Sequence, residues 1–135
     1  MALNPHFLLA SRNAILDLLT TNIGTSALFT IYAGVQPADV SSAVTAANTI
    51  VASLTCPTTN AFGAAAAGVI TANTITSDAS ASGGTAVWFS IRKNTGLRVI
   101  DGSVGTSGAD LNLNAVAITT GASVAVSAFT VTFAT

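Results

Sequence analysis

The fold of this chain is decided by residues 85–102, which read TAVWFSIRKNTGLRVIDG. Large apolar side chains alternate with smaller ones on both sides of the segment 93–96, and Gly96 can adopt the left-handed conformation that a tight turn needs. The pattern predicts an antiparallel hairpin with strands at 85–93 and 97–102. Three of the four basic residues flank the turn, so we expect it to face solvent: Arg92, Lys93 and Arg98.

The same short runs of Val, Ile, Thr, Phe and Ala continue on either side of the hairpin. They predict further strands at 27–33, 49–54, 69–77, 109–113, 115–118 and 123–133. Val124 and Val126 share one face of the last strand, whereas Phe129 and Val131 have the opposite parity. This change of phase predicts a bulge or a change of sheet near residues 127–128, which is typical of a sandwich or a jelly roll.

One helix is expected, at the N-terminal end. Asn4 is a suitable N-cap, Pro5 suits the first helical position, and apolar residues then recur at helical spacing. Ser11 is an alternative start, and Gly24 is the expected C-terminal stop. We therefore predict a mainly β, jelly-roll-like two-sheet sandwich with one N-terminal α-helix. It forms a single domain over residues 1–135, with the helix at about 5–22 and the β-sandwich at about 27–135.

Charged residues are scarce in this chain. Four basic and five acidic side chains make up 7% of the sequence, against about a quarter in an ordinary soluble domain. Residues 40–77 and 111–135 carry no charge. Surface charge limits self-association, and uncharged edge strands invite pairing with neighbouring chains. The composition therefore indicates either a membrane protein or a chain covered by neighbours in an assembly.

The membrane alternative has less support in the sequence. Both charge-free stretches are interrupted every few positions by Thr, Ser, Asn, Gly or Pro, and a spanning helix needs about 20 mainly apolar residues. The first residues do not resemble a secretory signal, and the aromatic residues are too few for the girdles of a membrane barrel. The net charge of −1 gives no reason to expect binding to nucleic acid or to anionic lipid.

No group of residues predicts catalysis or a cofactor. His6 is the sole histidine and Cys56 the sole cysteine, so zinc motifs and disulfides within the chain are not expected. The five Asp residues are scattered and mostly precede turns, which makes them turn formers rather than paired acid–base carboxylates. The glycine-rich segment 101–110 lacks the Lys of a phosphate loop and the clustered carboxylates of a calcium site. Trp88, Tyr32 and Asp110 are the few candidates for a sugar pocket.

Three segments resemble a family of small virion structural proteins of tailed bacteriophages. They are ASRNAILD at 10–17, IYAGVQPAD at 31–39 and DGSVGTSGADLNLN at 101–114. The resemblance extends over most of the chain, and proteins of this kind include capsid decoration (cement) proteins, which are commonly jelly-roll-like and often trimeric. It implies a structural role in the virion and defines no functional residues.

The expected function is therefore non-enzymatic. The chain is predicted to be a virion protein, assembled in the host cytoplasm, that binds the major capsid protein or other virion proteins, reinforces the shell and forms a homo-oligomer, with a trimer as the expected state. The alternative is a tail or fibre component, possibly a host-surface binding module, and a small hydrolase is the least supported class. The residues expected to make contacts are Leu3, Asn4, Pro5, His6 and Phe7, together with the weakly charged loops.

Overall fold

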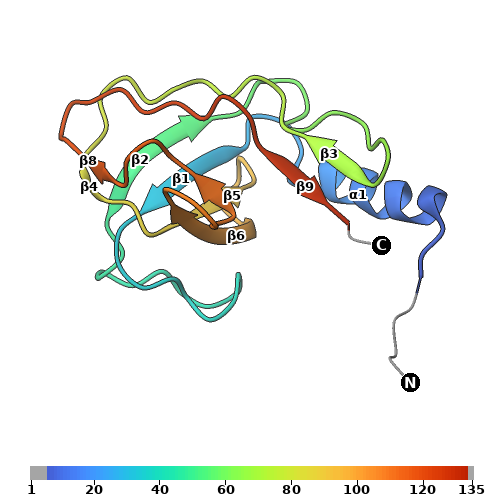
Figure 1. Ribbon diagram of the computed structural model, residues 1–135, viewed down its shortest axis with the longest axis horizontal. Helices are drawn as coiled ribbons and strands as arrows, with labels where there is room; N and C mark the ends of the chain where they lie inside the picture. The colour runs from blue at the N-terminus through green and yellow to red at the C-terminus, as the bar shows by residue number, and fades with distance from the viewer. Residues whose placement is uncertain (1–5, 134–135) are drawn as a thin grey trace.

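The computed structural model describes residues 6–133, which contain one helix and nine strands (Figure 1). In chain order the elements are α1 (Leu9–Ile23), β1 (Leu28–Tyr32), β2 (Ile50–Thr55), β3 (Val69–Thr71), β4 (Gly84–Thr85), β5 (Trp88–Arg92), β6 (Arg98–Gly105), β7 (Leu111–Asn112), β8 (Ala117–Ile118) and β9 (Thr130–Thr132). Five strands form one sheet in the order β2-β1-β5-β6-β7, and two ribbons pair β3 with β9 and β4 with β8. The predicted mainly β class with one helix is confirmed.

The helix is shorter at its start than predicted. It begins at Leu9, between the two predicted starts, and Leu8 at the N-cap is extended and forms no side-chain cap. A start at Pro5 is therefore wrong, because residues 6–8 are not helical; Asn4 and Pro5 themselves lie outside the described residues. At the other end Gly24 adopts φ 78° and its N–H donates to the Thr20 carbonyl, which confirms the predicted stop. No helix of the described chain has the length and apolar character to cross a bilayer.

The central hairpin forms as predicted. β5 and β6 pair antiparallel with Phe89 opposite Gly102, and β1 pairs antiparallel with both β5 and β2. The turn closes through Gly96, which has φ 91° and donates its N–H to the Lys93 carbonyl at 2.9 Å. β7 adds a short parallel pairing to the far edge of β6.

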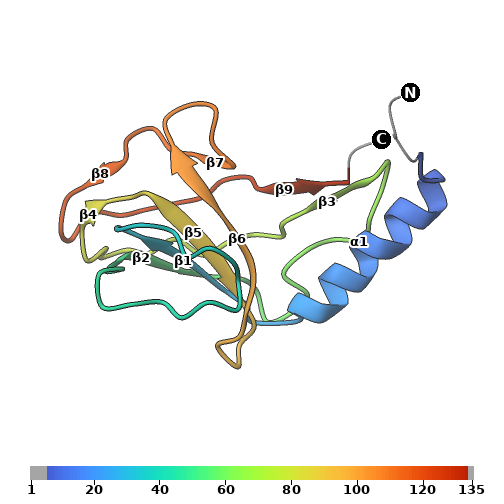
Figure 2. The same cartoon turned by 90° about the horizontal axis from the view of Figure 1, so that it is seen from below.

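Both faces of this sheet are buried over β5. On one face Phe89 stacks on Phe29, with ring centroids 5.0 Å apart, and joins the main hydrophobic core. On the other face Trp88 stacks on Tyr32 at 4.3 Å, and both rings are buried. Residues 35–48, which we call the strap, run along this second face (Figures 1 and 2). Side chains that alternate along the hairpin therefore point into two buried layers, instead of one pointing into the core and the next into solvent.

The C-terminal segment covers the core side of the sheet. Val124, Val126 and Phe129 are buried, while Ser127 and Ala128 between them are exposed, so the predicted change of phase is confirmed. The long strands predicted at 69–77 and 123–133 are reduced to β3 and β9 plus isolated bridges such as Asp78 with Val124. The layer opposite the five-stranded sheet consists of these ribbons and extended segments, so a complete second sheet of jelly-roll type is not confirmed.

Candidate interaction surface

Every charged side chain of the protein contacts another part of the chain. The four basic groups bind carbonyls, a phenol or an amide, and the five acidic groups accept from backbone N–H groups, from serine hydroxyls or from Arg98. The pairs are Arg12 with the Phe133 carbonyl, Asp17 with Ala65 N–H, Asp39 with Ser41 and Ser42, Asp78 with Ser53 and Ser80, Arg92 with the Tyr32 hydroxyl, Lys93 with Asn22, Arg98 with the strap and Asp101, and Asp110 with Ser103. The charges are therefore engaged in fastening segments of the fold to one another.

Arg98 is the most heavily engaged of these groups. Its guanidinium donates to the carbonyls of Asp39, Val40 and Ser42 at 2.7–3.1 Å and lies over the Trp88 ring. It also pairs with Asp101 at 3.3 Å, where the two side chains are only 6% and 4% exposed. The turn faces solvent as predicted, since residues 94–97 are exposed, but the Arg98 side chain beside it is buried because it binds the strap.

Three carboxylates stabilise turns by accepting backbone N–H groups, as the sequence predicted. The N–H of Ser53 and then that of Ser80 hold the pKa of Asp78 below its ordinary value, and Ser103 does the same to Asp110 through its N–H and then its hydroxyl. Asp39 has a lowered pKa because the side chain and N–H of Ser41 bind it. Asp78 also covers β2, because it binds the N–H of Ser53 on the outer edge of that strand at 2.8 Å.

These lowered pKa values predict acid sensitivity. A carboxyl group whose pKa is lower in the folded state stabilises the fold fully above its unfolded pKa, and this stability is lost as the pH falls through the folded value. The free energy of unfolding is thus expected to be flat near neutrality and to decrease below about pH 4. Urea titrations at a series of pH values measure it, and Asp78→Asn with Asp110→Asn should flatten the acid limb. If the free energy of unfolding of the double variant decreases with acid as steeply as that of the parent protein, Asp78 and Asp110 are not the cause of the acid sensitivity.

The candidates for chemistry do not come together. His6 is exposed, and the described residues contain no group of three His, Cys, Asp or Glu that could hold a metal ion. Trp88 and Tyr32 are 0% and 2% exposed, so neither ring can present a surface to a sugar. Asp110 lies on the opposite side of β6, where Ser103 occupies its carboxylate. Cys56 is buried, and burial raises the pKa of its thiol, which opposes reactivity.

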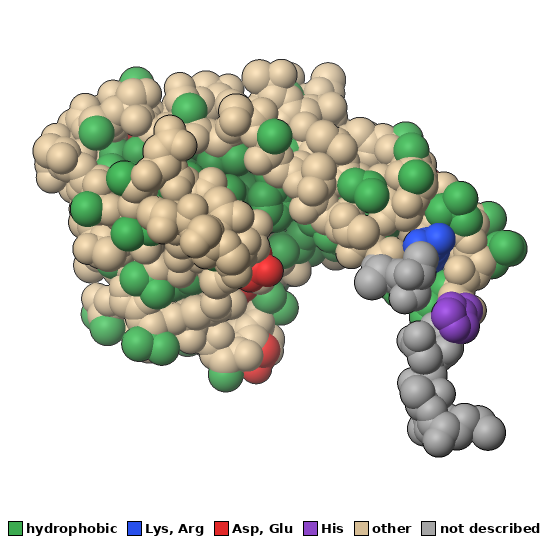
Figure 3. Space-filling view, in the orientation of Figure 1, with side chains coloured by type: hydrophobic (Ala, Val, Ile, Leu, Met, Phe, Trp, Pro, Cys, Tyr) green, Lys and Arg blue, Asp and Glu red, His purple; other side chains and the backbone are tan. Residues whose placement is uncertain are grey.

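Large apolar side chains are exposed instead. Ile15 and Leu18 lie on the outer stripe of α1, where Leu18 is 70% exposed, and Leu8 at the N-cap is exposed as well. A groove along this helix is lined by Ile15, Leu18 and Leu19 with Thr21 and Asn22. No charged side chain of the described residues lines this groove, and the two charged residues of the helix, Arg12 and Asp17, bind the Phe133 carbonyl and the Ala65 N–H. Figure 3 shows green side chains gathered on the helical end of the molecule. The sequence gives this helix a wide apolar face, which is consistent with packing on a sheet or against a partner, and the structure leaves part of that face exposed.

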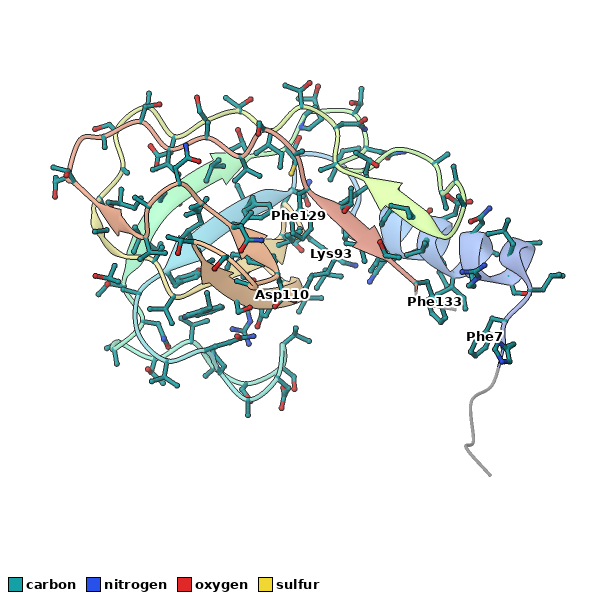
Figure 4. All side chains as sticks on the ribbon, in the orientation of Figure 1. Phe7, Lys93, Asp110, Phe129 and Phe133 are labelled. Carbon is teal, nitrogen blue, oxygen red and sulfur yellow. The ribbon has the colours of Figure 1, made fainter. Side chains whose placement is uncertain are left out.

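The N-terminal residues predicted to make contacts are only partly described. Leu3, Asn4 and Pro5 lie outside the described residues. His6 and Phe7 are exposed, and the Phe7 ring packs edge-on against Phe133, with centroids 5.4 Å apart (Figure 4). The surface of the described chain around α1 and the end of β9 thus carries exposed apolar side chains together with Arg12 and Asp17. Comparisons of the chain with protein-family models, with curated proteins and with solved structures give no match.

Proposed function

We propose that this chain is a non-enzymatic structural protein of a tailed-bacteriophage particle, and that many copies bind the major capsid protein as a decoration (cement) protein. The observation that carries the proposal is that every charged side chain bonds to another group of the fold, while large apolar side chains such as Leu18 and Leu97 stay exposed. The resemblance of the sequence to phage virion proteins supplies the kind of particle.

The energetics of burial support a covered surface. Apolar area removed from water contributes about 25 cal/mol per Å². Taking an ion out of water costs several kcal/mol even after relaxation. The groove along α1 is lined by Ile15, Leu18, Leu19, Thr21 and Asn22, so covering it removes apolar area from water without desolvating an ion in its lining. Weak contacts of this kind become collectively strong in a lattice of many copies.

A jelly-roll-like sandwich remains part of the proposal. The C-terminal segment packs over the five-stranded sheet through Phe129, whose ring meets those of Phe29 and Phe89 at 5.4 and 5.2 Å. Outside the five-stranded sheet, the described residues form the ribbons β3-β9 and β4-β8. The proposal takes these ribbons as the reduced counterpart of a second sheet.

Electron microscopy of intact particles tests the proposal directly. Density for this chain on the head lattice, at the contacts between capsid subunits, is the expected result. Density confined to the tail would favour the alternative of a tail or fibre component, and a chain absent from the particle would contradict both. Particles that lack the chain are expected to release their genome at a lower temperature.

The apolar stripe of α1 makes a second prediction. Leu18→Lys places a charge in the middle of the stripe and should reduce binding to particles at least about tenfold, because the buried ammonium must be desolvated. The melting temperature should hardly change, since Leu18 is largely exposed. Thr95→Lys, which adds the same charge at the exposed hairpin turn, is the matched control. Equal binding by both variants would show that the stripe is not the contact.

A further inference from the structure

β9 has one free edge. It pairs with β3 on one side, and no other strand of the described chain lies on its other side in either view (Figures 1 and 2). The bonds to the β3 side use the odd residues: Ala72 N–H donates to the Phe129 carbonyl at 2.8 Å, and Phe133 N–H donates to the Gly68 carbonyl at 2.9 Å. Because backbone groups alternate along an antiparallel strand, the N–H and C=O of Thr130 and Thr132 point away from β3.

The outer edge of β2 differs from this free edge of β9, because other segments of the chain bind to it. The outer edge of β2 is closed by Asp78 on Ser53, by the pair Thr55 with Thr76, and by Gly83 N–H on Val51. β9 has none of the usual protections, since residues 128–133 contain no Lys, no Pro and no charge. Thr130 and Thr132 are exposed, and within residues 6–133 nothing bonds to their outward groups.

A hollow lies beside this edge. It has a volume of about 270 Å³ and is lined by Thr130, Val131 and Thr132 of β9, by Phe89, Ile100 and Phe129, and by the carboxylates Asp101 and Asp110. Figure 4 places Phe129 and Phe133 at the two ends of β9 and Asp110 across from Phe129. The hollow leaves space for side chains of a strand that binds at the edge.

We propose that a second copy of this chain pairs its own β9 with this edge, antiparallel about a two-fold axis at Val131. A rotated copy sets the N–H groups of Thr130 opposite the carbonyls of Thr132 in the second copy, and the reverse, so donors meet acceptors throughout. Such pairing also places Thr beside Thr across the interface, which stabilises a sheet. Residues 128–133 carry no charge, so no like charges meet along the paired strands themselves.

The contact is small and therefore weak. Its four backbone hydrogen bonds cover much less than the roughly 1,600 Å² of a standard interface. We expect a dimer in solution at high protein concentration only, and pairing within a particle, where neighbours are held close together. The inference rests on the proposed structural role, for which it supplies a pairwise contact between copies; a threefold contact, as in the predicted trimer, would require another surface.

Cysteine cross-linking tests the register. In a Cys56→Ala background, Val131→Cys should form an intermolecular disulfide with itself under an added oxidant, because residues directly opposite in a non-hydrogen-bonded pair have Cα atoms about 4.5 Å apart. In this register, residue 130 of one copy lies opposite residue 132 of the second copy, so neither Thr130→Cys nor Thr132→Cys lies opposite the same residue of the other copy. Each alone should cross-link at least about tenfold more slowly, and a mixture of the two should cross-link readily.

A charge at the edge provides the control. Thr132→Lys added to the Val131→Cys variant should slow cross-linking about tenfold, whereas Thr58→Lys on an exposed loop should not. Similar rates for all three single-cysteine variants, or no dimer of any of them at the highest concentration, would overturn the inference. Both results come from the purified protein, so they leave the location of the chain on the particle, and with it the proposed function, to be decided by microscopy.

Discussion

Replacing Arg98 with Met lowers the free energy of unfolding by about 3–5 kcal/mol, because it leaves the Asp101 carboxylate buried without a counter-ion. The side chain of Asp101 is 4% exposed, and its oxygens have no hydrogen-bond donor among the described residues. The three strap carbonyls lose their bonds to the guanidinium as well, and that of Asp39 keeps its bond from the Ser42 N–H. Urea denaturation followed by tryptophan fluorescence measures both effects, since Trp88 lies directly beneath the guanidinium.

A second substitution separates the contribution of the Arg98–Asp101 ion pair to stability from that of the bonds between Arg98 and the strap. Asp101→Asn in the Arg98→Met background removes the uncompensated charge and should restore more than about 1 kcal/mol of the free energy of unfolding. The bonds from the guanidinium to the strap remain missing in this double variant. Lys93→Met, a change of the same kind at the turn, should cost less than about 1 kcal/mol because its bond to Asn22 is exposed. A loss below about 1 kcal/mol for Arg98→Met would show that the strap is held by other contacts.

Phe129→Ala is expected to destabilise the protein by about 3–5 kcal/mol, the usual cost of deleting a buried aromatic ring. The ring of Phe129 meets those of Phe29, Phe62 and Phe89 with centroids 5.2–6.2 Å apart. It is the side chain through which the C-terminal segment joins the central sheet, so its loss should also loosen β9. Thermal unfolding and amide hydrogen exchange of residues 129–133 measure the two consequences.

The matched control is Phe7→Ala. Phe7 packs edge-on against Phe133 and is 47% exposed, so its removal should cost well under half as much. Phe129→Leu keeps most of the apolar volume and should fall between the two. Equal losses for Phe7→Ala and Phe129→Ala would contradict the central place of Phe129 in the core.

The sequence pattern was sufficient to predict those features of the structure that depend on residues close together in the chain. The hairpin around Gly96, the helix stop at Gly24 and the change of phase at Ser127 and Ala128 all follow from short-range periodicity and turn chemistry. The start of the helix could not be found in this way. A good capping sequence competes there with the packing of Phe7 on Phe133, a contact between the two ends of the chain.

The sequence by itself determined that this protein is mainly β, has one N-terminal helix and carries very few charges. Only the tertiary structure decided what the charges do. Arg98 and Asp101 are close in sequence, but the strap that buries them comes from far along the chain, and burial is a property of contacts between distant segments. The free edge of β9 was decided in the same way, since a strand's pattern does not show whether a second strand lies beside it.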